Sequence, residues 1–212
     1  MLKVTQEQKS ERSRGAILEA ALELFSKQGY RGTSIREIAE QARLSTGNVY
    51  HHFPDKEALF RTLLDQYWAA IESPDFPFNK ALATGAFPRD LEYLARAAEE
   101  SVRSHRRHVA LIYVDVVEFQ GTHIRKFYSD MSGRFATFLN TRYSAGALED
   151  QLLPGTDPTT AVMLTSRIFL QYFAVEILFG VPEQLGKDTP SAMREISAIL
   201  RNGFVKPPAP RK

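Results

Sequence analysis

Residues 33–56 of the chain read TSIREIAEQARLSTGNVYHHFPDK, and this stretch decides the fold. Ser34, followed three residues later by Glu37, forms the Ser-x-x-Glu capping box that starts a helix. Ser45 offers a hydroxyl that caps a second helix over about residues 46–52. That helix ends before Pro54, because proline pushes the preceding residue out of the α region. Two short helices joined by a three-residue turn predict a helix-turn-helix, whose second helix enters the major groove of DNA.

The rest of the chain also has the periodicity of helices. The pattern predicts a helix over residues 11–28 that ends at Gly29 and a helix that Asp55 caps. Further helices are expected over about residues 90–108, 109–120, 123–145, 159–179 and 190–202. Residues 72–89 are irregular, but their three phenylalanines are expected to pack on the body of the protein. No strand alternation stands out, so the predicted fold class is all-α.

This pattern predicts a division into domains. Residues 1–54 form a three-helix head, with a mildly basic arm over residues 1–10 that is either a disordered terminus or a contact to phosphates. Residues 55–205 form a helical bundle for ligand binding and dimerisation, and residues 206–212 form a disordered tail.

Composition narrows the function classes. The 212 residues include no cysteine, which excludes disulfides and thiolate metal sites. A net charge of +2 is too small to indicate nucleic-acid binding by itself. Residues 161–181 are apolar enough to span a bilayer, yet Arg167 and Glu176 lie among them, so a buried helix is expected and no membrane partner. The polar N-terminal residues lack the apolar run of a signal peptide, and a cytoplasmic protein is expected.

Three segments carry a family resemblance: residues 29–39 (GYRGTSIREIA), 44–53 (LSTGNVYHHF) and 55–59 (DKEAL). Over roughly residues 11–60 the chain resembles the DNA-binding domain of the TetR family of bacterial transcriptional regulators. The resemblance implies a ligand-responsive regulator, most often a repressor, that binds a palindromic operator as a homodimer and is released by a small effector. The DNA contacts that it implies fall on Ser34, Arg43, Ser45, Thr46, Gly47, Asn48, Tyr50, His51 and Lys56.

Side-chain chemistry supports several of these contacts. Asn48 can hydrogen-bond a base edge, Gly47 permits close approach of the backbone, and Lys56 can neutralise a phosphate. Ser34 and Ser45, however, act as helix caps whether or not DNA is present. Tyr50 fits either a DNA contact or the three-helix core, and both alternatives stay open.

The later helices suggest how the chain dimerises and what it binds. The apolar helix over residues 159–179 predicts, with the last helix, a dimer interface over about residues 159–203, although burial within its own domain is the alternative. Aromatic residues can line a pocket for an apolar or aromatic effector, or can be ordinary core. They are Trp68, Phe87, Tyr113, Phe119, Phe127, Phe169, Tyr172 and Phe173.

No sequence motif points to catalysis, a cofactor or a metal, and we expect none of the three. His105 and His108 have loosely metal-like spacing with Asp115, Glu118 and His123, but neighbouring arginines would repel a cation, so a solvated basic face is expected. A helical small-molecule carrier or enzyme with a degenerate DNA-binding head is the alternative function, and a purely structural dimer is a third.

Overall fold

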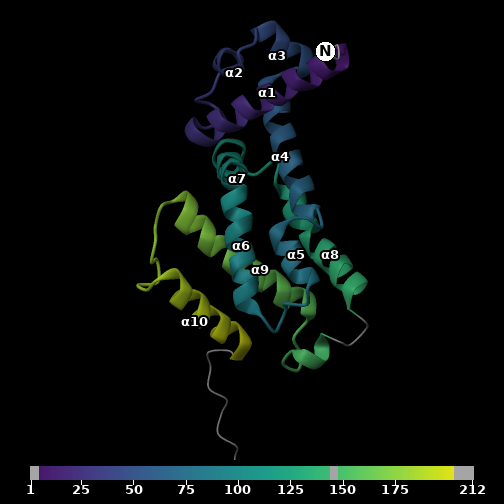
Figure 1. Ribbon diagram of the computed structural model, residues 1–212, viewed down its shortest axis with the longest axis vertical. Helices are drawn as coiled ribbons and strands as arrows, with labels where there is room; N and C mark the ends of the chain where they lie inside the picture. Colours follow the sequence, from purple (N-terminus) through teal and green to yellow (C-terminus); the bar gives the residue numbers. More distant parts are fainter. Residues whose placement is uncertain (1–4, 144–147, 203–212) are drawn as a thin grey trace, which may run out of the picture. The chain divides into compact units, whose positions relative to one another are not determined.

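The computed structural model describes residues 5–143 and 148–202. Within these ranges the chain is all-α, as predicted, and contains no strand. The helices are α1 (Gln6–Gln28), α2 (Ile35–Ala42), α3 (Thr46–His52), α4 (Lys56–Glu72), α5 (Pro77–Ala83), α6 (Leu91–Ser104), α7 (Arg106–Phe119), α8 (Arg125–Arg142), the short 3₁₀ helix η1 (Glu149–Gln151), α9 (Pro158–Leu178) and α10 (Thr189–Asn202) (Figure 1).

The chain packs as two compact units. The head unit comprises Met1–Glu72 and His105–Ser129, and the body unit comprises Ser73–Ser104 and Asp130–Lys212. These units differ from the predicted division after residue 54, because α4 packs against α1 and α7 packs against both α1 and α4. The functional division into residues 1–54 and 55–205 therefore stays a prediction, and the predicted tail 206–212 lies outside the described residues.

Helix α1 is the centre of the head unit, because α2, α3, α4 and α7 all pack against it. Figure 1 shows α2 and α3 beside α1. The core between these helices is closed by large side chains such as Phe25, Phe60 and Ile38, each 0% exposed. The rings of Phe25 and Phe60 pack edge to face with centroids 5.5 Å apart. Burial of such rings favours the three-helix core predicted from the sequence.

The start of α1 differs from the prediction. The helix begins at Gln6, so residues 6–10 are helical and only residues 1–4 of the predicted arm remain outside the described chain. Thr5 explains the earlier start: its side chain accepts from the Gln8 N–H, and the Gln8 side chain accepts from the Thr5 N–H. This capping box satisfies two N–H groups that would otherwise lack a partner at the helix start.

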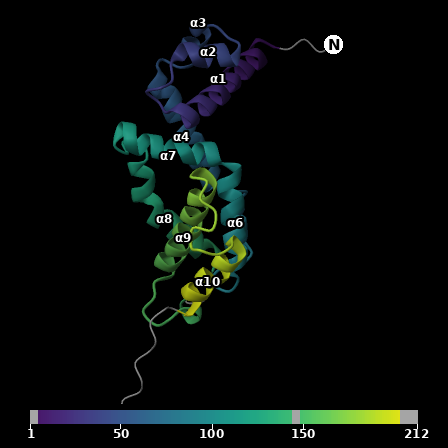
Figure 2. The same cartoon turned by 90° about the vertical axis from the view of Figure 1, so that its left-hand side faces the viewer.

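In the body unit, α6 packs against α5, α9 and α10 (Figure 2). The residues before α6 confirm one expectation, because Phe76, Phe78 and Phe87 are all buried. The predicted single helix over residues 90–108 is wrong, since α6 ends at Ser104 and α7 begins at Arg106. The Ser104 hydroxyl donates to the Glu100 carbonyl, a local bond that competes with the helical ladder at this point.

Helix α8 is buried at few positions. Phe127 and Leu139 are its buried residues. Most of its other side chains are polar and exposed. The helix therefore lies at the surface and contributes one edge to the packing.

Helix α9 starts as predicted, with the Asp157 side chain accepting from the Thr160 N–H and Pro158 in the first turn. By length and composition α9 is apolar enough to cross a membrane, and 39% of its most apolar window is buried within the protein. Leu164 on α9 is 53% exposed and Phe179 directly after it is 54% exposed. The alternative that this helix is fully buried in its own domain does not hold, because apolar side chains remain at its surface.

Candidate nucleic-acid interface

The turn between α2 and α3 has the geometry that the sequence predicts. The Ser34 hydroxyl accepts from the Glu37 N–H at 3.2 Å, and the Glu37 carboxylate accepts from the Ser34 N–H at 2.7 Å. Arg43 ends α2 in the left-handed conformation, with φ 59°, and its N–H donates to the carbonyls of Ala39 and Glu40. Leu44, which follows Arg43, is half-buried.

Helix α3 is fixed on one side and exposed on the other. Val49 is 0% exposed and Phe53, directly after the helix, is 4% exposed, so both anchor α3 to the core of the head unit. The Ser45 hydroxyl accepts from the Asn48 N–H at 3.2 Å and caps the helix. This arrangement leaves the N-terminal face of α3 toward solvent.

The residues predicted to contact DNA all belong to the head unit. Asn48 and Lys56 are half-buried. The others are exposed, namely Ser34, Arg43, Ser45, Thr46, Gly47, Tyr50 and His51. Tyr50 is 56% exposed, which decides between its two alternatives: it is not a residue of the three-helix core.

The Lys56 ammonium also makes contacts within the protein. It donates to the carbonyls of Tyr30 at 2.8 Å and Thr33 at 2.6 Å, and it lies 4.1 Å from the centre of the Tyr30 ring. Burial lowers the pKa of the Lys56 ammonium from its ordinary value, while Glu118 and Glu37 act in the opposite direction. An ammonium has three N–H donors, so a phosphate contact and the two carbonyl bonds are compatible.

A surface hollow of about 440 Å³ lies among the turn before α2, the start of α2, α3 and the start of α4. Three of the predicted DNA contacts, Ser34, Tyr50 and Lys56, line it together with Arg31. Its cationic and hydroxyl groups can bind an anionic oxygen such as that of a phosphate, while the carboxylates of Glu37 and Asp55, which also line the hollow, oppose an anion.

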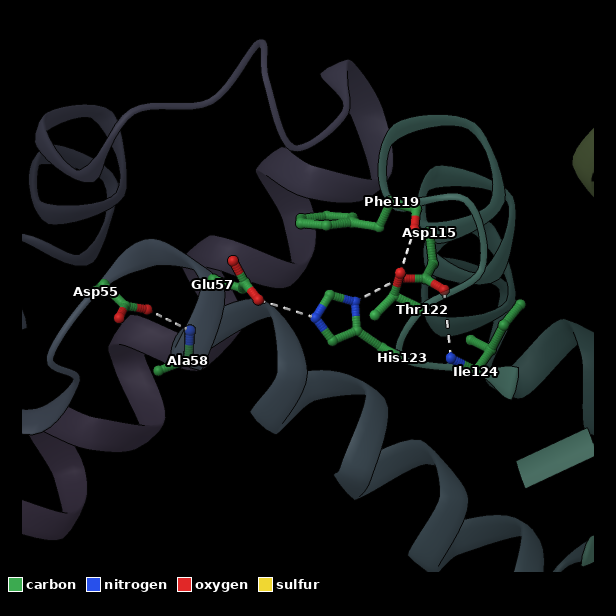
Figure 3. A network of polar contacts seen from close by, with 8 residues as sticks. All are labelled: Asp55, Glu57, Ala58, Asp115, Phe119, Thr122, His123 and Ile124. Carbon is green, nitrogen blue, oxygen red and sulfur yellow. Dashed lines mark hydrogen bonds and ion pairs between the residues drawn. The ribbon is translucent and has the colours of Figure 1, made fainter. Parts of the chain in front are cut away.

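Helix α7 is tied to the head by polar contacts that the sequence did not predict. His123, just after α7, points between Asp115 of α7 at 2.6 Å and Glu57 of α4 at 3.3 Å (Figure 3). Asp115 is 0% exposed and also accepts from the Ile124 N–H at 3.3 Å. This network joins α4 to the turn that follows α7.

Two further contacts join α7 to α1 and to the turn after it. The Arg107 guanidinium lies 2.6 Å from Glu19 and 3.3 Å from Glu23 of α1. The Glu118 carboxylate accepts from the N–H groups of Tyr30 and Arg31. These partners are more than 80 residues apart in the chain, so no local signal in the sequence points to them.

The aromatic residues predicted to line an effector pocket divide between the two units. Trp68, Tyr113, Phe119 and Phe127 belong to the head unit, and Phe87, Phe169, Tyr172 and Phe173 belong to the body unit. The Trp68 and Phe127 rings stack with centroids 3.9 Å apart. Phe119 stacks on Phe60 at 5.2 Å, so its ring forms part of the head core. Phe169 and Phe173, at 0% and 1% exposed, are tightly packed in the body unit.

The histidines after α6 do not form the solvated basic face expected from the sequence. The His108 ring is half-buried and stacks on the Tyr67 ring with centroids 5.5 Å apart. Burial, with smaller contributions from neighbouring His105 and Arg107, lowers the pKa of His108 from 6.5 to about 4. His108 is therefore neutral near pH 7. Within residues 5–143 and 148–202, no group of three metal-ligating side chains is suited to hold a metal ion.

Comparison with known proteins points to one family. Residues 17–63 match the family described as bacterial regulatory proteins, tetR family. The chain is similar to the HTH-type transcriptional regulator HbdR of Aromatoleum sp. (strain CIB), with 38% identity over 119 residues that cover 49% of this chain and 52% of that protein. It spans about half the length of this and several other curated relatives that it matches.

Two solved structures share the fold over most of the chain. NalD, the secondary repressor of the MexAB-OprM multidrug efflux pump in Pseudomonas aeruginosa, is 22% identical with a TM-score of 0.59, covering 94% of this chain and 99% of that one. The transcriptional regulator FadR from Bacillus subtilis, solved in complex with stearoyl-CoA, is 16% identical with a TM-score of 0.59, covering 90% of this chain and 99% of that one. At these identities the likeness establishes the fold alone.

Proposed function

We propose that this chain, whose residues 17–63 match the tetR family of bacterial regulatory proteins, is a ligand-responsive transcriptional regulator that acts as a repressor. The observation that carries this proposal is the exposed N-terminal face of α3, held outward by Val49 and Phe53 on its buried side. A helix fixed in this way is suited to enter a major groove without rearrangement.

On DNA, each exposed residue has a role that follows from its chemistry. Asn48 reads a base edge, with adenine as its best geometric partner, and Gly47 lets the backbone approach closely. Tyr50 and His51 contact the sugar-phosphate backbone or a thymine methyl group. Ser34, Arg43, Ser45, Thr46 and Lys56 hold phosphates and so fix the register of α3.

A homodimer is required for specificity, because one recognition helix reads too few base pairs to select a site in a genome. Support for a dimer interface over about residues 159–203 comes from apolar side chains exposed on α9, on α10 and between them. They are Leu164, Phe179, Val181, Leu185 and Ile199. Covering such an apolar surface with a second copy lowers the free energy of the assembly. Two copies related by a two-fold axis then read a palindromic operator.

The effector is proposed to be a small apolar or aromatic molecule bound by the domain of residues 55–205. The many buried aromatic side chains of the chain support this class, and FadR, which shares the fold, was solved with stearoyl-CoA. Effector binding favours a dimer whose heads no longer match the operator, which is a shift between two populated states. We propose that the protein acts in the cytoplasm, where its DNA lies.

The proposal is tested by selecting bound fragments from sheared genomic DNA at near-physiological salt. Recovery of a short palindrome supports a dimeric, specific regulator. Asn48→Ala is then expected to lower discrimination between operator and mismatched sites by about 1–3 kcal/mol, the value of one bidentate base contact. Asn140→Ala, an exposed amide of α8 in the body unit, is the matched control and should leave discrimination unchanged.

A failed selection separates the alternatives. Binding that is independent of sequence is repeated after denaturing and refolding the protein, which removes any effector that co-purified. If a palindrome still does not appear, the carrier or enzyme alternative gains support, and a tightly bound ligand or turnover is then sought.

A further inference from the structure

The turn between α1 and α2 is bound on its N–H side by a carboxylate from α7. The Glu118 carboxylate accepts from the Tyr30 N–H at 2.9 Å through one oxygen and from the Arg31 N–H at 2.7 Å through the other. The Glu118 side chain is 15% exposed, and the Arg31 guanidinium lies 4.0 Å from the same carboxylate. Hydrogen bonds from N–H groups to a carboxylate are about twice as strong as those between neutral groups.

Gly29 makes this approach possible. It follows α1 with φ 80°, a conformation that favours glycine, and this turns the next two N–H groups away from the helix. A Cβ atom at Gly29 would lie 2.5 Å from an oxygen of Glu118, closer than two such atoms can come. A side chain here would therefore displace the carboxylate.

The carbonyl side of the same turn is bound by Lys56, which donates to Tyr30 and Thr33. Thr33 leads directly into the capping box of Ser34 and Glu37 at the start of α2. With both sides bound, the turn fixes where α2 begins. The position of α2 in turn sets that of α3, since the two helices are in contact.

Helix α7 is itself held rigidly enough to act as a support. Arg107 anchors its first turn to α1, and Asp115 with His123 anchors its other end to α4. The chain enters α7 directly from α6 of the body unit, with only His105 between the two helices. Glu118 is thus the point at which α7 touches the turn that leads into α2 and α3.

We propose that Glu118 is a positioning residue for DNA binding: through the N–H groups of Tyr30 and Arg31 it holds the turn that orients α2 and α3. This inference rests on the proposed function, because it specifies what keeps the DNA-binding surface in its active arrangement. Glu118 itself need not contact DNA. Its negative charge alone opposes binding to a polyanion.

The direction of the change in DNA affinity therefore distinguishes a charge effect of Glu118 from a positioning effect. Removing a carboxylate from a DNA-binding unit without any positioning effect strengthens DNA binding. Glu118→Gln keeps the size of the side chain, but its NH₂ group faces an N–H donor and one hydrogen bond is lost. We expect operator affinity to fall about 10-fold or more, which corresponds to the loss of one charge-assisted hydrogen bond. Asp65→Asn, which removes an exposed carboxylate of α4, is the matched control and should leave affinity unchanged or slightly higher.

Hydrogen exchange measured by NMR on the full chain reports on the turn without DNA. In Glu118→Gln we expect the Tyr30 and Arg31 amides to exchange about 10-fold faster or more, with amides in the middle of α1 unchanged. Circular dichroism checks that the variant is folded at the concentrations used.

The outcomes separate this inference from the proposed function. If wild-type protein binds an operator and Glu118→Gln binds it equally or more tightly, the positioning role is overturned and the proposed function stands. Unchanged exchange at both amides would also overturn it. If the wild-type protein selects no operator even after denaturing and refolding, the proposed function is overturned instead.

Discussion

Replacement of Lys56 by methionine tests whether this residue stabilises the fold as well as contacting DNA. Methionine keeps an unbranched apolar stem but removes the ammonium. The variant therefore loses the bonds to the carbonyls of Tyr30 and Thr33 and the contact 4.1 Å above the Tyr30 ring. Thr33 is 2% exposed, so its carbonyl loses this donor in a place that water reaches poorly.

The size of the effect follows from these contacts. Each hydrogen bond to a charged group contributes about 1.5–3 kcal/mol, and the ring contact about 0.5–1 kcal/mol. Burial of the ammonium opposes this gain, as its lowered pKa indicates, and its half-buried position allows solvent to screen it. We therefore expect Lys56→Met to lower the free energy of unfolding by about 2 kcal/mol.

Urea unfolding followed by circular dichroism measures this change, and the midpoint should fall while the slope stays the same. Lys27→Met is the matched control: Lys27 is 74% exposed in an ion pair with Glu23 on α1, and its loss should change stability by less than about 0.5 kcal/mol. If Lys56→Met were as stable as the wild-type protein and only DNA binding weakened, Lys56 would be a phosphate contact alone, and the role assigned to its carbonyl bonds would be refuted.

Two further predictions concern the histidine cluster and the exposed face of α9. Because the pKa of His108 is lowered from 6.5 to about 4 in the folded chain, the unfolded chain binds the extra proton first, and stability is lost as pH falls from about 6.5 to about 4. Over that pH range, the free energy of unfolding of His108→Leu, measured by urea titration, should therefore fall by about 1–2 kcal/mol less than that of the wild-type protein. An equal fall in both proteins would contradict this. Leu164→Glu should weaken self-association at least 100-fold by light scattering, since a dimer would bury an unpaired carboxylate. A variant that remains dimeric with unchanged mass would exclude Leu164 from the interface.

Local chemistry explains why the head could be predicted from the sequence. The capping boxes, the break before Pro54 and the ends of α3 depend on hydrogen bonds and steric contacts between residues at most four positions apart. Such signals are complete within a short stretch of sequence. The capping box of Thr5 and Gln8 is equally local, so the early start of α1 was predictable from the same rule although it was not predicted.

Tertiary packing decided the solvent exposure of individual side chains, which a short stretch of sequence does not determine. The residues around Tyr50 are compatible with a position in the core or in solvent. The packing of Val49 and Phe53 into the core is what turns Tyr50 toward solvent. Burial against Tyr67 is the main reason that the pKa of His108 is lowered, and the neighbouring Arg107 acts in the same direction, so His108 is neutral near pH 7. In both cases the outcome depends on the solvent exposure of the side chain, which the surrounding helices set.

The sequence by itself determined that the described chain is all-α, where α3 begins and ends, and that residues 17–63 match the tetR family of bacterial regulatory proteins. Only the tertiary structure decided that Lys56 and Glu118 bind opposite sides of one turn. The physical reason is distance along the chain. Glu118 is 88 residues from Tyr30, and the two meet only because α7 packs across α1 and α4.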